Sequence, residues 1–402
     1  MANSLSKRNS FSILTQQSSG LRTGAPISAS AISPPSSFSN NVATSMMASS
    51  RSSVYHHRAA YYESPWPLFA ADWSRSPNQR DQGRIAVATC AEDSKNRIQI
   101  IEANTTTEIH SSGQQIPSIG LSLATEASHS YPCTKLLWDP LARSSSSIQR
   151  LASAGDFLRI WEFNPETAAL RQSLLLANKT KSEHTAPLTS LDWNTTDNSL
   201  IITSSIDTTC TIWDLNTSLA KTQLIAHDKE VFDARFTVGS VDVFASVGAD
   251  GSVRVFDLRS LEHSTIIYEP ANPPPLLRIA TNHRDQNILA TFAVDSPVVH
   301  VLDIRSPGTP VVELDAHSGP VNAVEWSPQK RNILASAGDD CQILIWDVAA
   351  SPMASTSSLL STSRGDIALA YTETSEVNNI TWNASGDWVC SVAGRGVQAI
   401  RL

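Results

Sequence analysis

Histidine, hydroxyl and aspartate side chains recur in this sequence at constant spacing. A histidine stands nine residues before an aromatic position in four places, and an aspartate stands six residues before a second aromatic position, with a hydroxyl four residues before the aspartate. The two complete sets are His184, Thr203, Asp207 and Trp213, and His317, Ser336, Asp340 and Trp346. A hydroxyl, an imidazole and a carboxylate are the groups that a serine hydrolase uses as nucleophile, base and orienting acid.

The repetition of the set favours a structural role over a catalytic one. A hydrolase needs one nucleophile, whereas this set recurs along the chain, and no Gly-x-Ser-x-Gly turn surrounds its hydroxyls. Histidines in separate repeats cannot converge on one metal ion. A buried chain of indole, hydroxyl, imidazole and carboxylate would instead satisfy each member, because an unpaired buried polar group costs about 1–3 kcal/mol. We therefore predict structural tetrads in a protein that is not an enzyme and binds no metal or cofactor.

Two short patterns, each counted seven times, predict the elements that position these side chains. The first ends in Trp or a substitute, at Trp73, Trp138, Trp193, Phe236, Ala280, Trp326 and Trp382. The second is an alternating stretch expected to form a strand, at residues 98–102, 158–163, 210–215, 253–258, 299–304, 343–348 and 397–402. From Trp193 to Trp326 the first pattern repeats at 43, 44 and 46 residues, and periods of about 40–45 are typical of propeller blades. The sequence therefore predicts an all-β, seven-bladed β-propeller over residues 54–402.

The last repeat ends at its third strand, so its outer strand has to come from elsewhere. Residues 58–63, just before the first repeat, have the length and tyrosine content of a strand. We expect them to pair with the end of the chain, which closes the ring and removes exposed sheet edges.

Residues 1–53 differ in composition from the rest of the chain. They contain 17 Ser, no Asp or Glu, and four basic residues, too little apolar surface to offset the entropy of ordering. We predict a disordered tail. A mitochondrial transit peptide is the alternative, although four basic residues spread over 53 positions form a poor amphipathic face.

Charge and cysteine content narrow the class of partner. After the tail, the chain carries 26 basic and 38 acidic residues, which disfavours direct binding to nucleic acid. No apolar run approaches the roughly 18 residues of a spanning helix. Five scattered cysteines without a CxxC pair suit reduced core thiols. We expect a soluble, intracellular monomer in cytoplasm and nucleus.

Several longer stretches carry a family resemblance. They are residues 63–70 (ESPWPLFA), 186–194 (APLTSLDWN), 203–213 (TSSIDTTCTIW), 221–231 (KTQLIAHDKEV), 244–254 (FASVGADGSVR) and 257–268 (DLRSLEHSTIIY). From Tyr62 to Leu402 the chain resembles the WD-repeat adaptors of the plant Transparent Testa Glabra group and their animal counterpart, a cullin-four-associated scaffold bound by DYRK- and HIPK-type kinases. The resemblance implies a protein-binding scaffold whose partners are such kinases or MYB and basic helix-loop-helix regulators. A substrate receptor of a cullin-four ubiquitin ligase is the alternative.

The same resemblance implies candidate docking residues. Ligase docking in this group uses an Arg two residues after the Trp-Asp aspartate, a position held here by Arg259 and Arg305, although Phe256 and Leu302 replace the Trp. The two arginines are equally compatible with solvated charges at strand ends, worth under about 1 kcal/mol.

Three aromatic residues near the expected closure are further candidates for a partner surface. They are Tyr61, Tyr62 and Trp66. Aromatic side chains often anchor protein interfaces, and packing within the closure is the alternative role.

Overall fold

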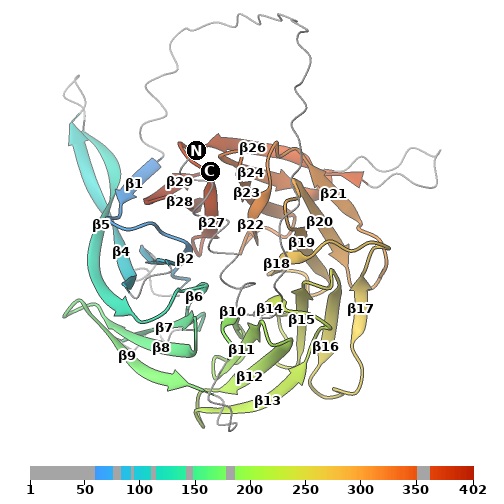
Figure 1. Cartoon of the computed structure of the whole chain (residues 1–402). Coiled ribbons are helices and arrows are strands. Elements are labelled where there is room, and N and C mark those ends of the chain that lie inside the picture. The colour runs from blue at the N-terminus through green and yellow to red at the C-terminus, as the bar shows by residue number, and fades with distance from the viewer. Residues whose placement is uncertain are drawn as a thin grey trace, which may run out of the picture.

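The computed structural model describes residues 59–75, 83–91, 95–109, 115–141, 148–177, 186–350 and 363–402, and the predicted tail lies outside these ranges. Within them the chain forms seven sheets in a ring, six of four strands and one of five (Figure 1). The predicted all-β, seven-bladed propeller is confirmed.

Each blade begins with a strand beside the central axis. These inner strands are β2 (Ala70–Trp73), β6 (Lys135–Trp138), β10 (Leu188–Trp193), β14 (Val231–Phe236), β18 (Leu276–Thr281), β22 (Val321–Trp326) and β27 (Val377–Trp382). The second strands are β3 (Arg84–Ala88), β7 (Gln149–Ala154), β11 (Leu200–Ser205), β15 (Val243–Gly248), β19 (Ile288–Ala293), β23 (Ile333–Gly338) and β28 (Trp388–Ala393). All six residues of β11 are buried, because neighbouring blades cover both of its faces.

The third and fourth strands complete each blade outward. The third strands are β4 (Asn96–Ile109), β8 (Leu158–Asn164), β12 (Thr209–Asp214), β16 (Val253–Asp257), β20 (Val298–Asp303), β24 (Gln342–Asp347) and β29 (Gly396–Arg401). The outer strands are β5 (Gln115–His129), β9 (Ala169–Leu176), β13 (Leu219–Ile225), β17 (Thr265–Tyr268), β21 (Val312–Asp315), β26 (Asp366–Thr372) and, for the seventh blade, β1 (Ala59–Glu63). Along β13 exposed and half-buried residues alternate, as in a strand with one covered face.

The ring closes where β1 pairs antiparallel with β29. Tyr61 lies opposite Gln398 and Tyr62 opposite Val397. The prediction that residues just before the first repeat supply the missing strand is therefore confirmed, with Ala59 as its first described residue.

The apolar core is divided among the contacts between blades. Each of the seven buried clusters in the described chain joins two neighbouring blades. The largest includes Trp326 of the sixth blade with Phe292 and Leu314 of the fifth. Each blade consequently depends on both neighbours for its stability.

The predicted pattern in the fifth blade is wrong by one residue. In the sixth blade Trp326 lies opposite Leu334, the second residue of β23, whereas in the fifth blade Thr281, not Ala280, lies opposite the second residue of β19, Leu289. The Thr281 hydroxyl donates to the carbonyl of Phe236 in the preceding blade at 3.0 Å. Because no aromatic residue stands at this position, the sequence pattern does not show which residue pairs with the second residue of β19.

Two further features go beyond the predicted blades. The β4–β5 hairpin continues past the blade edge, with pairing as far as Ile109 and Gln115 (Figure 1). A short strand, β25 (Ser363–Arg364), pairs in parallel with β21 and gives the fifth blade its fifth strand.

The only helical element in the described part of the chain is a single 3-10 turn, η1 (Val348–Ala350). No helix among the described residues is long and apolar enough to span a bilayer.

Candidate functional site

The sixth blade contains a continuous hydrogen-bonded tetrad. The indole N–H of Trp346 on β24 donates to Ser336 Oγ on β23 at 2.8 Å, and His317 Nε2 lies 2.7 Å from the same oxygen. His317 Nδ1 lies 2.9 Å from the Asp340 carboxylate, which sits in the turn after β23. Because a carboxylate only accepts, the ring carries its proton on Nδ1, and the Ser336 hydroxyl donates to Nε2. Burial lowers the pKa of His317, although Asp340 opposes the shift.

The fourth blade repeats this arrangement without the indole. His227 Nε2 lies 2.8 Å from Ser246 Oγ, and its Nδ1 lies 2.9 Å from the Asp250 carboxylate. In place of the indole, Phe256 stacks on Phe244 with ring centroids 5.0 Å apart. A stacked pair of apolar rings thus takes the place of the hydrogen-bonded indole of the sixth blade.

The second blade keeps the indole, hydroxyl and imidazole but not the carboxylate. Trp161 donates to Ser153 Oγ at 2.9 Å, and His129 Nε2 lies 3.0 Å from it. Asp156, one residue closer to the Trp than its counterparts, pairs instead with Arg159, and His129 Nδ1 faces the backbone carbonyl of Tyr131 at 2.5 Å. Burial is the main cause that lowers the pKa of His129 to about 4.

In the third blade the structure describes three of the four predicted tetrad residues. Trp213 donates to Thr203 Oγ1 at 2.9 Å, and Asp207 accepts from the backbone N–H of Thr209 at 3.1 Å. His184 lies outside the described residues. Its bond to Thr203 stays a prediction.

The seventh blade uses a carboxyl group where other blades have histidine. Glu373 Oε1 accepts from the Ser391 hydroxyl at 2.6 Å, and burial raises the pKa of Glu373. Sequence reasoning had not given this residue a partner, although its position in the repeat was the available signal.

Acid will destabilise the protein through His129. Its folded-state pKa of about 4 lies below the ordinary value of 6.5, so the neutral ring's contribution is complete above pH 6.5 and is lost as the pH falls through 4. His129→Gln should reduce the loss of unfolding free energy between pH 7 and 4 by about 3 kcal/mol, measured by urea unfolding. The same urea measurement on His263→Gln, which changes an exposed histidine in the loop before β17, is the matched control for replacing a histidine outside the buried networks.

Aspartates of the inner strands join one blade to the next. Asp72 accepts from the backbone N–H of Trp138 in the second blade at 2.7 Å, and Asp192 accepts from that of Phe236 in the fourth at 2.9 Å. Burial is the main cause that raises the pKa of both carboxyls, that of Asp72 to about 6. Sequence reasoning missed this role, although the aspartate directly before Trp73 and Trp193 was the signal.

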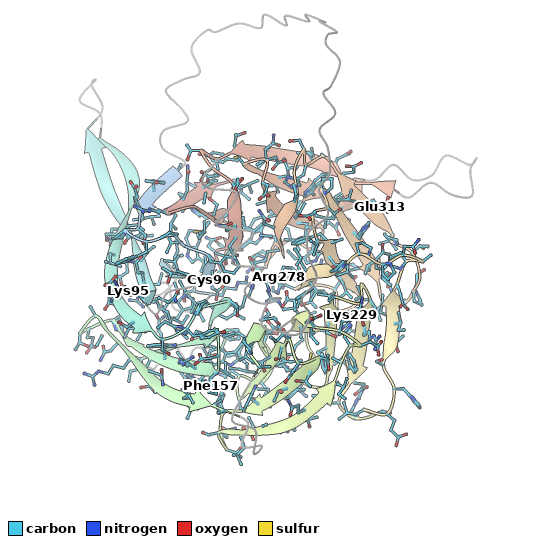
Figure 2. All side chains as sticks on the ribbon, viewed as in Figure 1. Cys90, Lys95, Phe157, Lys229, Arg278 and Glu313 are labelled. Atoms are coloured by element: carbon cyan, nitrogen blue, oxygen red, sulfur yellow. The ribbon has the colours of Figure 1, made fainter. Side chains whose placement is uncertain are left out.

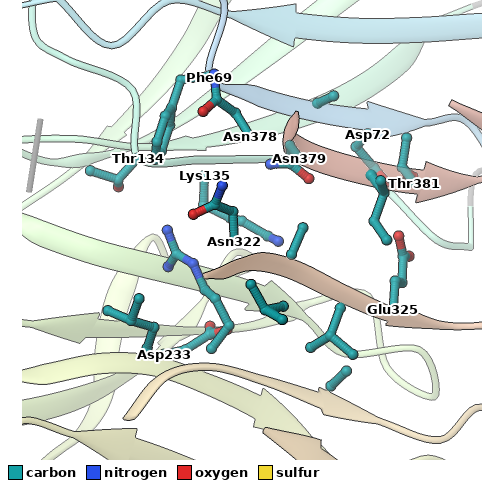
Figure 3. A pocket seen from close by; sticks show the side chains of 18 of the residues that line it. Phe69, Asp72, Thr134, Lys135, Asp233, Asn322, Glu325, Asn378, Asn379 and Thr381 are labelled. Carbon is teal, nitrogen blue, oxygen red and sulfur yellow. Dashed lines mark hydrogen bonds between the residues drawn. The ribbon is translucent and has the colours of Figure 1, made fainter. Parts of the chain in front are cut away.

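The inner strands enclose a central channel of about 1280 Å³. Figure 2 shows Arg278 and Cys90 near the axis, whereas Phe157 and Glu313 lie toward the periphery. Charged side chains of both signs line the channel, among them Asp72, Lys135, Asp233 and Glu325 (Figure 3). The described residues contain no group of three or more His, Cys, Asp or Glu side chains that could hold a metal ion.

The three aromatic candidates for a partner surface have different environments. Tyr61 on β1 is 57% exposed, whereas Tyr62 packs against the cluster between the seventh and first blades. Trp66 is half-buried under the Arg97 guanidinium, 5.7 Å from the ring centroid. Of the three, Tyr61 offers the most accessible ring to a partner.

The two candidate docking arginines occupy equivalent places in neighbouring blades. Arg259 follows β16 and Arg305 follows β20, with side chains 69% and 62% exposed. Each Nε donates to the aspartate two residues earlier, at 2.8 Å to Asp257 and 2.9 Å to Asp303. The bond holds each guanidinium in place while leaving most of it open to solvent.

Seven blades with buried polar networks are the architecture of a WD-repeat β-propeller. In agreement, the model of the WD domain, G-beta repeat family matches residues 177–214 and 308–347. The chain is 42% identical over 342 residues to the DDB1- and CUL4-associated factor 7 homolog of Dictyostelium discoideum, covering 85% of this chain and 98% of that protein. WD repeat-containing proteins of Saccharomyces cerevisiae and Schizosaccharomyces pombe are 36% and 37% identical over 85% of this chain, and it covers 76% and 89% of them. The chain therefore belongs to the WD-repeat family of these relatives. This confirms the predicted resemblance as far as a WD-repeat family with a cullin-four-associated member.

Proposed function

We propose that this protein is a non-catalytic adaptor that brings proteins together on the surface of its propeller. The burial of its hydrolase-like groups carries the proposal. Ser153, Ser246 and Ser336 are fully buried, and each hydroxyl is bonded to a histidine of its own blade. A nucleophile must reach its substrate, so these side chains support the fold, and function falls to the exposed loops and rims.

The partner with the best support is a DDB1–CUL4 ubiquitin ligase, for which this chain would act as a substrate receptor. The relative from Dictyostelium is named for association with DDB1 and CUL4, and this chain covers 98% of it. Arg259 and Arg305 supply two exposed charges on adjacent blades, preorganised by Asp257 and Asp303. Arginine is enriched among the residues that dominate protein interfaces.

Replacing both arginines should weaken ligase docking without unfolding the blades. The Arg259→Ala, Arg305→Ala double variant should recover about tenfold less DDB1 than the unchanged chain in a quantitative pull-down, since an interface arginine often contributes more than 1 kcal/mol. Arg171→Ala, on the exposed outer strand β9, is the control and should bind normally. Undiminished recovery by the double variant, with an unchanged thermal melt, would rule out this docking surface.

A second set of partners follows from the resemblance to the kinase- and transcription-regulator-binding adaptors. Exposed Tyr61, at the closure, favours a second surface separate from the arginine pair. Such an adaptor would work in both cytoplasm and nucleus. Mass spectrometry of the same purifications identifies these partners: a DYRK- or HIPK-type kinase, or a MYB or helix-loop-helix regulator, should remain bound to the double variant. Ligase components alone would restrict the function to the ligase.

A further inference from the structure

The channel contains one level at which basic side chains outnumber acidic ones. Lys135, Asp233, Arg278 and Asn379 each stand three residues before the last residue of their inner strands, β6, β14, β18 and β27. All four line the channel, and Figure 3 shows Lys135 and Asn379 beside the same open space. Two cations, one carboxylate and one amide therefore line the channel at this level.

The carboxylate at this level is already engaged. Asp233 accepts from the backbone N–H groups of Ala234 at 3.0 Å and Ile279 at 3.2 Å, and it pairs with Arg235 at 3.7 Å. Arg235 stands two residues further along β14 and also pairs with Asp192. The hydrogen bonds of Asp233 thus support the strands, while its negative charge attracts Lys135 and Arg278 without an ion pair to either.

Acidic side chains attract the two cations, but neither cation contacts a carboxylate directly among the described residues. Arg278 Nη1 donates to two neutral acceptors, the backbone carbonyls of Thr189 and Phe232, each at 3.3 Å. Neither Lys135 nor Arg278 forms an ion pair with a described carboxylate, including Asp295 and Asp339, which also line the channel. The channel therefore holds two cations that no carboxylate among the described residues contacts directly.

The electrostatics of both groups agree with this geometry. Burial, followed by repulsion from Arg235, lowers the pKa of Lys135 to about 8, although Asp233 and Glu325 oppose the shift. Burial is also the main cause that lowers the pKa of Arg278; attraction by Asp233 opposes this shift and repulsion from Arg235 adds to it. A ligand that brings negative charge to this level would restore the pKa of both cations toward ordinary values.

We propose that this level of the channel binds a small oxyanion, a phosphate or a carboxylate, between Lys135, Arg278 and Asn379. The guanidinium and ammonium supply charge-assisted hydrogen bonds, and the Asn379 amide, which has no hydrogen-bond partner among the described residues, supplies a neutral donor. The channel volume of about 1280 Å³ admits such a molecule. The site is independent of ligase docking, because it uses the inner strands rather than the rim.

Binding can be measured with inorganic phosphate and with citrate on the purified full chain. Each should raise the melting temperature more than sodium chloride at equal ionic strength, and calorimetry should show binding that Lys135→Met weakens by about tenfold or more. Lys221→Met, on the exposed outer strand β13, is the control and should bind like the unchanged chain. Stabilisation by phosphate alone or citrate alone identifies which oxyanion the site takes.

A measurement on the unchanged chain covers the case in which Lys135→Met fails to fold. With lysines labelled by ¹³C-methylation, the Lys135 signal should titrate near pH 8 and move upward on addition of the bound anion. The site would be refuted if neither anion stabilised the chain beyond sodium chloride, if Lys135→Met bound equally well, or if the Lys135 titration did not move.

Discussion

Deletion of residues 1–64 should abolish cooperative thermal unfolding, whereas deletion of residues 1–53 should leave the melting temperature almost unchanged. The longer deletion removes β1, which pairs with β29 from Ala59 opposite Ile400 to Glu63 opposite Gly396. It also exposes the cluster between the seventh and first blades, in which Ala60 is buried and against which Tyr62 packs. Losing the hydrogen bonds between β1 and β29 together with the buried apolar surface lowers the free energy of unfolding by on the order of 5 kcal/mol. This is comparable with the whole free energy of unfolding of many proteins.

Point variants within β1 separate strand pairing from a general effect of shortening the chain. Ala60→Asp places a charge in the buried cluster and should lower the melting temperature sharply, whereas Tyr61→Asp, on a residue that is 57% exposed, should change it little. Circular dichroism melts of both truncations and both point variants provide the comparison. Similar melts for the two truncations would contradict closure by this strand.

The number of blades and their closure could be predicted because bulky buried residues repeat in the sequence. A tryptophan such as Trp326 has to lie in an interface between blades, and recurrence at 43 to 46 residues leaves room for four short strands. The fifth blade shows the limit of this reasoning. Where Thr281 replaces the aromatic residue, nothing in the pattern distinguishes it from Ala280, and only the pairing with Leu289 reveals the register.

The polar networks were partly predictable for the same reason. His317, Ser336, Asp340 and Trp346 all belong to one repeat, so their spacing carries the information. The channel level containing Lys135 and Arg278 could not be anticipated. Its residues come from different blades, and their convergence depends on how inner strands align around the axis rather than on any spacing along the chain.

His317→Ala should destabilise the protein by about 4 kcal/mol in urea unfolding. The substitution leaves a cavity at a position that is 5% exposed, deprives Ser336 of a bond and removes the ring from the Asp340 carboxylate, whose side chain is 2% exposed. Breaking one member of a buried charged network costs about 3–5 kcal/mol, because the remaining groups stay desolvated without their partner. The backbone N–H of Ser318, which donates to Asp340 at 2.9 Å, offsets part of this loss.

The equivalent change in the fourth blade should cost less, which distinguishes a network effect from the loss of any buried histidine. After His227→Ala, Asp250 keeps its ion pair with Arg254 and its bond from Ser252, whereas no described ion pair remains for Asp340. Ala271→Ser, at an exposed position of the fifth blade, is the neutral control. Adding Ser336→Ala to His317→Ala should cost less than the sum of the single changes, because the two side chains share one hydrogen bond. Strict additivity, or a His317→Ala melt as high as that of Ala271→Ser, would show that the tetrad does not act as a stabilising unit.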